Sequence, residues 1–189
     1  MRLFLALELS EESRADLTRV LETFSRSLTG WRFVEPGAIH LTLRFLGELQ
    51  PERERAHRDA WRTTVGGFAP IRFRLGGAGV FPDPARPRVL WIGVQEDPPG
   101  GKLEELARAL EGAARAGGFP PEDRPFHPHL TLARGRKDVR ASPPRETLAE
   151  LGSVVECAEV ALLRSELGPA GARYSRLDAF PLAGGAGPR

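Results

Sequence analysis

The sequence predicts an α+β fold with mostly antiparallel strands, and three observations support this. The chain has 189 residues, 41% of them hydrophobic, with 27 Lys and Arg against 25 Asp and Glu, which suits one compact domain. Strand and helix patterns are interspersed without the strict alternation of a doubly wound sheet. The tetrapeptide His-Leu-Thr-Leu begins at residue 40 and again at residue 129, which indicates an internal duplication.

The first half of the chain opens with a strand pattern. Leu3, Leu5, Leu7 and Leu9 recur at every second position, which predicts a strand with one buried face. Ser10 is a favourable N-cap, and the apolar residues that follow at helical spacing predict an amphipathic helix. The elements expected after the first strand are that helix over 11–29, a strand over 39–46, a helix opened by Pro51 and ending near residue 65, a strand over 71–75, and a loop from Gly76 to Pro87.

The second half begins with a short apolar run, Val89 to Val94, which predicts a central strand. A helical spacing of leucines from Leu103 predicts the next helix. The elements expected beyond it are a loop over 117–128, a strand over 129–133, a short helix from Ser142 to about Leu151, strands over about 154–164 and 173–180, and a disordered glycine-rich tail over 183–189. Residues 1–182 are therefore expected to form a single domain.

A glycine-rich stretch, Gly-Gly-Ala-Gly at residues 76–79, follows a predicted strand as phosphate-binding loops do. It leads to Val80, Phe81 and Pro82, however, and not to a helix that begins with Lys and Ser or Thr. We therefore reject this stretch as a nucleotide-binding motif.

Composition narrows the class of protein further. The single cysteine, Cys157, cannot form an internal disulfide, and we expect it to be an inert buried thiol in a reducing compartment. The apolar start of the chain runs directly into Glu11 and Glu12, so we expect no signal peptide, no membrane segment and a cytoplasmic location. The chain has 25 Arg against 2 Lys, no Asn and few Gln, Cys and Met, which resembles GC-rich coding combined with depletion of thermolabile residues and favours a bacterial thermophile. Its net charge of +2 favours only local contact with nucleic acid.

The repeated tetrapeptide contains two of the four histidines, His40 and His129. With eight threonines in the chain, the probability that two of four histidines have a Thr two residues later by chance is only about 0.01. Residues i and i+2 of a strand share a face, so each His shares a face with its Thr, Thr42 or Thr131, while the leucines point to the core. If the two halves pack about a pseudo-twofold axis, two imidazoles and two hydroxyls converge.

This convergence predicts acid–base chemistry on a phosphate ester. Two imidazoles with ordinary pKa values near 6.5 supply one general base and one general acid at neutral pH. Two hydroxyls can donate hydrogen bonds to the non-bridging oxygens of a phosphate.

The paired motifs resemble those of the two-histidine phosphoesterase superfamily, and within it the RNA 2′,3′-cyclic phosphodiesterases, also described as 2′-5′ RNA ligases. The similarity extends along nearly the whole chain and includes HLTLRFLGE from His40 and FHPHLTLAR from Phe126. It implies a bilobal fold, with two pseudo-symmetric lobes of mostly antiparallel sheet and flanking helices around a central groove. It also implies metal-independent opening of a terminal 2′,3′-cyclic phosphate on RNA to a 2′-phosphate, without a cofactor, and the reverse ligation to a 2′-5′ linkage.

The resemblance also implies roles for individual residues. They are His40 as general acid, His129 as general base, Thr42, Thr131 and Arg134 on the phosphate, and Phe45 stacked on a base. Arg134 and Phe45 each lie five residues after a motif histidine, and strict alternation puts them on the opposite face. A twist, a bulge or the strand end must turn them back. The implied partner is an RNA end bearing a 2′,3′-cyclic phosphate, for example on a tRNA half, and we expect a monomer.

Three alternatives stay open. The same chemistry fits a small cyclic nucleotide or a 2′-5′ oligoadenylate as substrate. A non-catalytic RNA-binding module is disfavoured by the weak basic charge and the duplicated sites. His127 and His129 form an H-x-H pattern typical of a metal site, but no carboxylate lies at a suitable spacing to complete it, so we expect no metal.

The basic residues that follow the second motif form either a solvated loop or a track for an RNA backbone: Arg134, Arg136, Lys137 and Arg140.

Overall fold

The structure, a computed structural model, describes residues 2–48, 51–136, 139, 154–168 and 171–184. The helices are α1 (Glu11–Ser27), α2 (Pro51–Gly66) and α3 (Lys102–Ala116), with a 3-10 turn η1 (Pro36–Ala38). The strands are β1 (Arg2–Glu8), β2 (Trp31–Phe33), β3 (His40–Glu48), β4 (Ile71–Phe81), β5 (Val89–Glu96), β6 (His129–Gly135), β7 (Val154–Cys157), β8 (Glu159–Gly168) and β9 (Gly171–Pro181). The predicted α+β class is confirmed.

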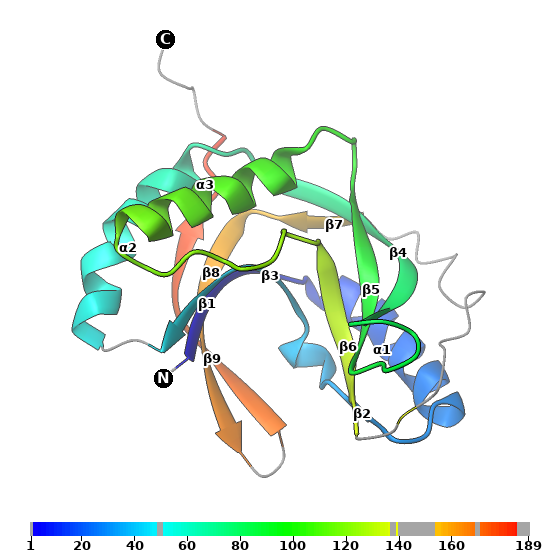
Figure 1. Cartoon of the computed structure of the whole chain (residues 1–189). Helices are drawn as coiled ribbons and strands as arrows, with labels where there is room; N and C mark the ends of the chain where they lie inside the picture. The colour runs from blue at the N-terminus through cyan, green and yellow to red at the C-terminus, as the bar shows by residue number, and fades with distance from the viewer. Residues whose placement is uncertain (1, 49–50, 137–138, 140–153, 169–170, 185–189) are drawn as a thin grey trace.

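The strands form one curled sheet in which the paired neighbours are antiparallel (Figure 1). Their order is β7-β4-β5-β6-β3-β1-β8-β9, with β2 paired to β6. This order is symmetric about the β6–β3 junction, where Leu41 pairs with Leu130. We call β3, β1, β8 and β9 the first-motif lobe, and β6, β5, β4 and β7 the second-motif lobe. The two pseudo-symmetric lobes implied by the resemblance are therefore halves of one continuous sheet.

The helices supply the apolar core that covers one face of this sheet. α1 contributes Leu17 and Phe24, α2 contributes Trp61, and α3 contributes Leu106 and Leu110, all buried in one cluster with the strand leucines. α2 packs against α3 and β9, and α3 against β3, whereas α1 lies beside β2 (Figure 1). Each lobe is thus built from segments that are far apart in the sequence.

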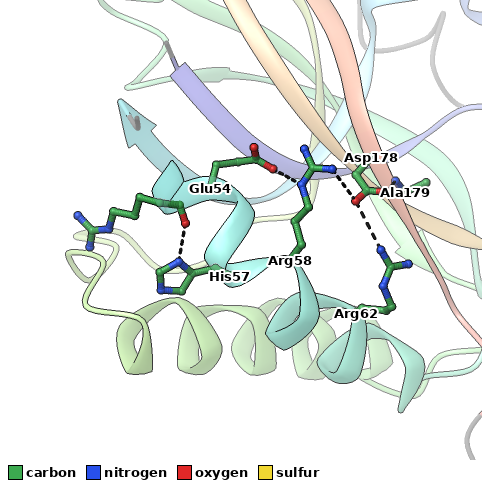
Figure 2. A network of polar contacts seen from close by, with 7 residues as sticks. Glu54, His57, Arg58, Arg62, Asp178 and Ala179 are labelled. Atoms are coloured by element: carbon green, nitrogen blue, oxygen red, sulfur yellow. Dashed lines mark hydrogen bonds and ion pairs between the residues drawn. The ribbon is translucent and has the colours of Figure 1, made fainter. Parts of the chain in front are cut away.

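A polar network fixes α2 to the outer strand of the first-motif lobe (Figure 2). Arg58 forms an ion pair with Glu54, one turn earlier on α2, and donates a hydrogen bond of 3.1 Å to Asp178 of β9. Arg62 lies 3.5 Å from the same carboxylate, which also accepts a 2.8 Å hydrogen bond from the Ala179 backbone. Because Glu54 is buried, its carboxylate requires the Arg58 charge beside it.

The predicted loop over 76–87 is wrong in its first part, because β4 continues to Phe81. The strand passes the glycines through a register shift between Gly76 and Ala78, where Gly77 has a φ of +68°. A bulge with a glycine in the left-handed region lets a strand bend and continue, which a sequence pattern scores as a loop.

Other differences lie at short elements. β2 has three residues, too few to show a periodicity, and was not predicted. The single strand expected over 154–164 is divided into β7 and β8 at Ala158. The predicted helix near 142–151 and residues 185–189 of the predicted tail lie outside the described residues. Within that tail, the Gly184 N–H donates a 3.1 Å hydrogen bond to the Phe68 carbonyl.

Candidate active site

Both motifs project from the same face of the sheet. The first leucines of the two motifs are paired and fully buried at the β3–β6 junction, so the residues that flank them point the other way. These are His40, Thr42, His129 and Thr131, and we call the surface that they share the motif face. Extending the antiparallel register by one residue places each histidine across from the threonine of the other motif. The structure therefore brings the predicted quartet together.

A matched bulge in each motif strand turns the later residues of the motifs back to this face. Leu43 of β3 and Leu132 of β6 are the extra residues, each three positions after its histidine. As a result Phe45 pairs with Phe4 of β1 on the motif face. Arg134 returns to the motif face in the same way on β6. The conflict with strict alternation is thus resolved by a bulge, one of the three possibilities that the sequence left open.

Both histidines are oriented by the same backbone device. The ring nitrogen Nδ1 of His40 lies 2.8 Å from the carbonyl oxygen of Ala38, and Nδ1 of His129 lies 2.6 Å from that of His127. A carbonyl oxygen only accepts hydrogen bonds, so Nδ1 carries the proton in both rings. Each neutral imidazole then keeps the lone pair on Nε2, which is the atom left to exchange a proton with a substrate.

Aromatic rings enclose each histidine. His40 stacks on Phe4 with ring centroids 4.7 Å apart and meets the edge of Tyr174 at 5.0 Å. His129 meets the edge of Phe81 at 5.1 Å. These contacts fix the rings in place and remove water from around them, which makes each ring harder to charge.

The pKa values of the two histidines are consequently lower than the ordinary value assumed from the sequence. Burial lowers the pKa of His40 to about 4, with smaller decreases from the charges of Arg134 and His129, although the hydrogen bond to Ala38 acts in the opposite direction. Burial also lowers the pKa of His129, and the charges of His127 and Arg134 add to that effect against its own backbone hydrogen bond. Arg134 therefore lies within electrostatic reach of both imidazoles.

Phe45 presents an aromatic surface at the edge of this site. Its side chain is 57% exposed, the single large hydrophobic side chain that is exposed among the described residues. Its ring lies 5.8 Å from that of Phe4, which in turn stacks on His40. A planar base that covers Phe45 would lie beside the first motif.

Comparison with known proteins agrees with this arrangement. A model of the 2′-5′ RNA ligase superfamily matches residues 34–169. This chain belongs to the 2′-5′ RNA ligase superfamily. A Methanothermobacter thermautotrophicus protein named RNA 2′,3′-cyclic phosphodiesterase is 36% identical over 186 residues, covering 96% of this chain and 99% of its own length. A Thermus thermophilus protein of the same name is 41% identical over 191 residues, covering 97% and 91%.

Solved structures share this fold. A crystal structure from Thermus thermophilus superposes with a TM-score of 0.80 at 36% identity, covering 97% of this chain and 99% of that one. Escherichia coli LigT complexed with 3′-AMP gives a TM-score of 0.75 at 29% identity, covering 96% and 97%. The resemblance stated from the two motifs is confirmed.

One buried charge in this superfamily member was missed by the sequence analysis. Arg44 follows the bulge on β3 and is 4% exposed. Its guanidinium forms ion pairs with Glu111 of α3 and, at 3.0 Å, with Glu122, and it also donates to the Pro120 carbonyl. The same Glu122 carboxylate accepts a 3.1 Å hydrogen bond from the Phe45 N–H. Arg44 thereby joins β3 to the loop that leads to the second motif, and the signal for it was a lone charge within the apolar run Thr-Leu-Arg-Phe-Leu.

The remaining predicted groups are accounted for as follows. Among the described residues, no group of three or more His, Cys, Asp or Glu side chains is arranged to hold a metal ion. Over the same residues, none of the helices is long and apolar enough to cross a membrane. Cys157 is buried, its thiol donates to the Glu8 carbonyl, and burial raises the pKa of the thiol to about 12. The predicted burial of this thiol is confirmed, and its inertness stays a prediction.

Proposed function

We propose that this chain is a metal-independent enzyme that hydrolyses the 2′,3′-cyclic phosphate at the end of a cytoplasmic RNA to a 2′-phosphate, and that it acts as a monomer. The observation that supports this most directly is the pair of imidazoles, each anchored through Nδ1 with Nε2 left for the substrate. The names of the curated relatives, RNA 2′,3′-cyclic phosphodiesterase, agree with it.

In this proposal the phosphate lies between the two motifs. The hydroxyls of Thr42 and Thr131 donate to its non-bridging oxygens, and Arg134 balances its charge. The base of the terminal nucleotide stacks on Phe45, which places the ribose beside His40.

The reaction then needs one proton removed and one supplied. His129 Nε2 takes a proton from water as the water oxygen attacks phosphorus, and His40 Nε2 gives a proton to the 3′ oxygen as its bond to phosphorus breaks. The product carries its phosphate on the 2′ oxygen. A pKa of about 4 means that charging His40 costs about 3 kcal/mol more than charging a free imidazole, and the negative phosphodiester beside the ring offsets this cost.

The test is an assay on an oligonucleotide that ends in a 2′,3′-cyclic phosphate, with and without EDTA. His40→Ala and His129→Ala should each lower kcat roughly 100-fold or more, and the double variant little further, because groups that act as a unit are not additive. His57→Ala is the matched control, since His57 packs on Trp61 and Phe119 away from the motifs. Near-normal turnover in either single variant, a 3′-phosphate product, or loss of activity in EDTA would each contradict the proposal.

A further inference from the structure

The second-motif lobe carries an aromatic cluster that extends beyond the one ring, Phe81, that holds His129. It consists of Phe81 at the end of β4, Trp91 of β5 and His127 in the loop before β6. The ring centroids lie 5.2 Å apart for Phe81 and Trp91, 5.1 Å for Trp91 and His127, and 5.5 Å for Phe81 and His127. Phe81 and Trp91 are half-buried and His127 is exposed, so the cluster forms a surface beside His129.

The strand register places this cluster on the motif face. Trp91 pairs with Thr131 and Gly93 pairs with His129, so the indole lies on the same side of the sheet as the second motif. Its ring centroid is 6.2 Å from that of His129. The cluster therefore borders the catalytic imidazole on the side away from Phe45 and the first-motif lobe.

The glycine-rich stretch rejected as a nucleotide loop explains how the indole fits. Gly79 of β4 pairs with Trp91, and a Cβ atom at position 79 would lie 2.1 Å from Cζ2 of the indole. Only glycine leaves room for the ring to lie across the neighbouring strand. The stretch thus shapes the surface beside His129.

Apart from the Phe81 contact that holds the His129 ring, this aromatic surface has no task in hydrolysis, in which the nucleophile is a water molecule. It has one if the nucleophile is the 5′-hydroxyl of a nucleoside, because that hydroxyl must reach phosphorus from the side of His129. We propose that Phe81, Trp91 and His127 form a second nucleoside subsite, which stacks the base of an RNA 5′ end and directs its hydroxyl to the cyclic phosphate. The inference rests on the proposed function, and it identifies where the RNA that supplies the 5′-hydroxyl binds during ligation.

The chemistry balances without any further reactant. The 5′ oxygen forms a bond to phosphorus, and its proton passes to His129 Nε2. The bond between phosphorus and the 3′ oxygen breaks, and that oxygen takes a proton from His40 Nε2. The product is a 2′-5′ phosphodiester with a free 3′-hydroxyl, and the two histidines exchange roles in the reverse reaction.

The experiment measures how the wild-type enzyme divides a cyclic-phosphate donor between water and an acceptor. An oligonucleotide ending in 2′,3′-cyclic phosphate is incubated with increasing concentrations of the dinucleotide ApA, whose 5′-hydroxyl is free, and ligated and hydrolysed products are counted. Phe81→Leu and His127→Ala should each raise the ApA concentration needed for equal division roughly 5- to 100-fold, the range that stacking of one base gives. With the wild-type enzyme, an acceptor whose 5′-terminal residue lacks its base should need a similarly higher concentration for equal division.

Phe45→Leu is the matched control, because it removes an aromatic ring from the donor side. It should slow ligation and hydrolysis together and leave their ratio unchanged. The subsite is refuted if the two variants divide the donor as the wild type does, if the abasic acceptor performs as well as ApA, or if hydrolysis proceeds with no 2′-5′ product at any ApA concentration. Absence of hydrolysis itself would instead overturn the proposed function.

Discussion

Replacing Arg134 by Gln tests whether its charge lowers the proton affinity of the two histidines proposed as acid and base. The Arg134 charge lowers the pKa of His40 and that of His129, so its removal should raise both. Burial is the larger cause in each case and stays in the variant. The pKa of His40 should therefore rise from about 4 but stay below the ordinary value of 6.5.

The wild-type pH profile follows from the same values. With a pKa of about 4, roughly one His40 ring in a thousand is protonated at pH 7 in the free enzyme. If His40 is the acid and His129 the base, kcat/KM is bell-shaped, with its acid limb near pH 4 and its alkaline limb below pH 6.5. On the alkaline side kcat/KM should fall about tenfold for each pH unit.

The assay measures kcat/KM for a nucleoside 2′,3′-cyclic phosphate from about pH 3.5 to about pH 8.5, a range over which both limbs can be followed. In Arg134→Gln both limbs should move to higher pH, and kcat/KM at its own optimum should fall about 10- to 100-fold, as expected when a charge-assisted hydrogen bond to phosphate is lost. Arg136→Gln removes an exposed charge two residues away and should leave both limbs in place. Limbs that do not move in Arg134→Gln, or a wild-type optimum above pH 6.5, would refute the reasoning.

Three further predictions concern stability and reactivity. The pKa of His40 is lower in the folded protein than the value near 6.5 in the unfolded chain, so the unfolded chain binds the proton first as the pH falls. The free energy of unfolding should therefore decrease by about 3 kcal/mol between pH 6.5 and 4. Denaturant titrations should show this decrease in the wild type and not in His40→Gln, and the same pH dependence in both proteins would contradict it. Arg44→Met should lower the free energy of unfolding by about 2 kcal/mol, since the charged hydrogen bonds to Glu111 and Glu122 are lost while both carboxylates, 25% and 37% exposed, keep part of their hydration; an unchanged free energy of unfolding would contradict this. Cys157 should resist iodoacetamide at pH 8 in the folded protein and react after denaturation, whereas rapid labelling of native protein would mean that the thiol is accessible.

The sequence was informative where a residue's task is local. Alternation of leucines identifies β1, and Ser10 caps α1 as expected. The repeated tetrapeptide locates the two motif strands, because the period of a strand fixes which residues share a face. The site residues that depend on pairing between strands could be named only by resemblance. Phe45 returns to the motif face because β3 bulges at Leu43, and a bulge is defined by the neighbouring strand, which a single sequence does not show.

The same reason explains why the sequence could not rank the two histidines. The tetrapeptides are identical, and each ring donates to the carbonyl two residues earlier, so the local structure of both motifs is the same. Their neighbours differ. His40 stacks on Phe4 and meets the edge of Tyr174, and its pKa falls to about 4. His129 instead meets the edges of Phe81 and Trp91. In the free enzyme, the residue proposed as the acid therefore binds a proton weakly. Under this proposal His40 is protonated, and so able to donate a proton, only after the negatively charged phosphate is bound beside it. Binding and activation are then one event, and an empty site holds no acid that is ready to act.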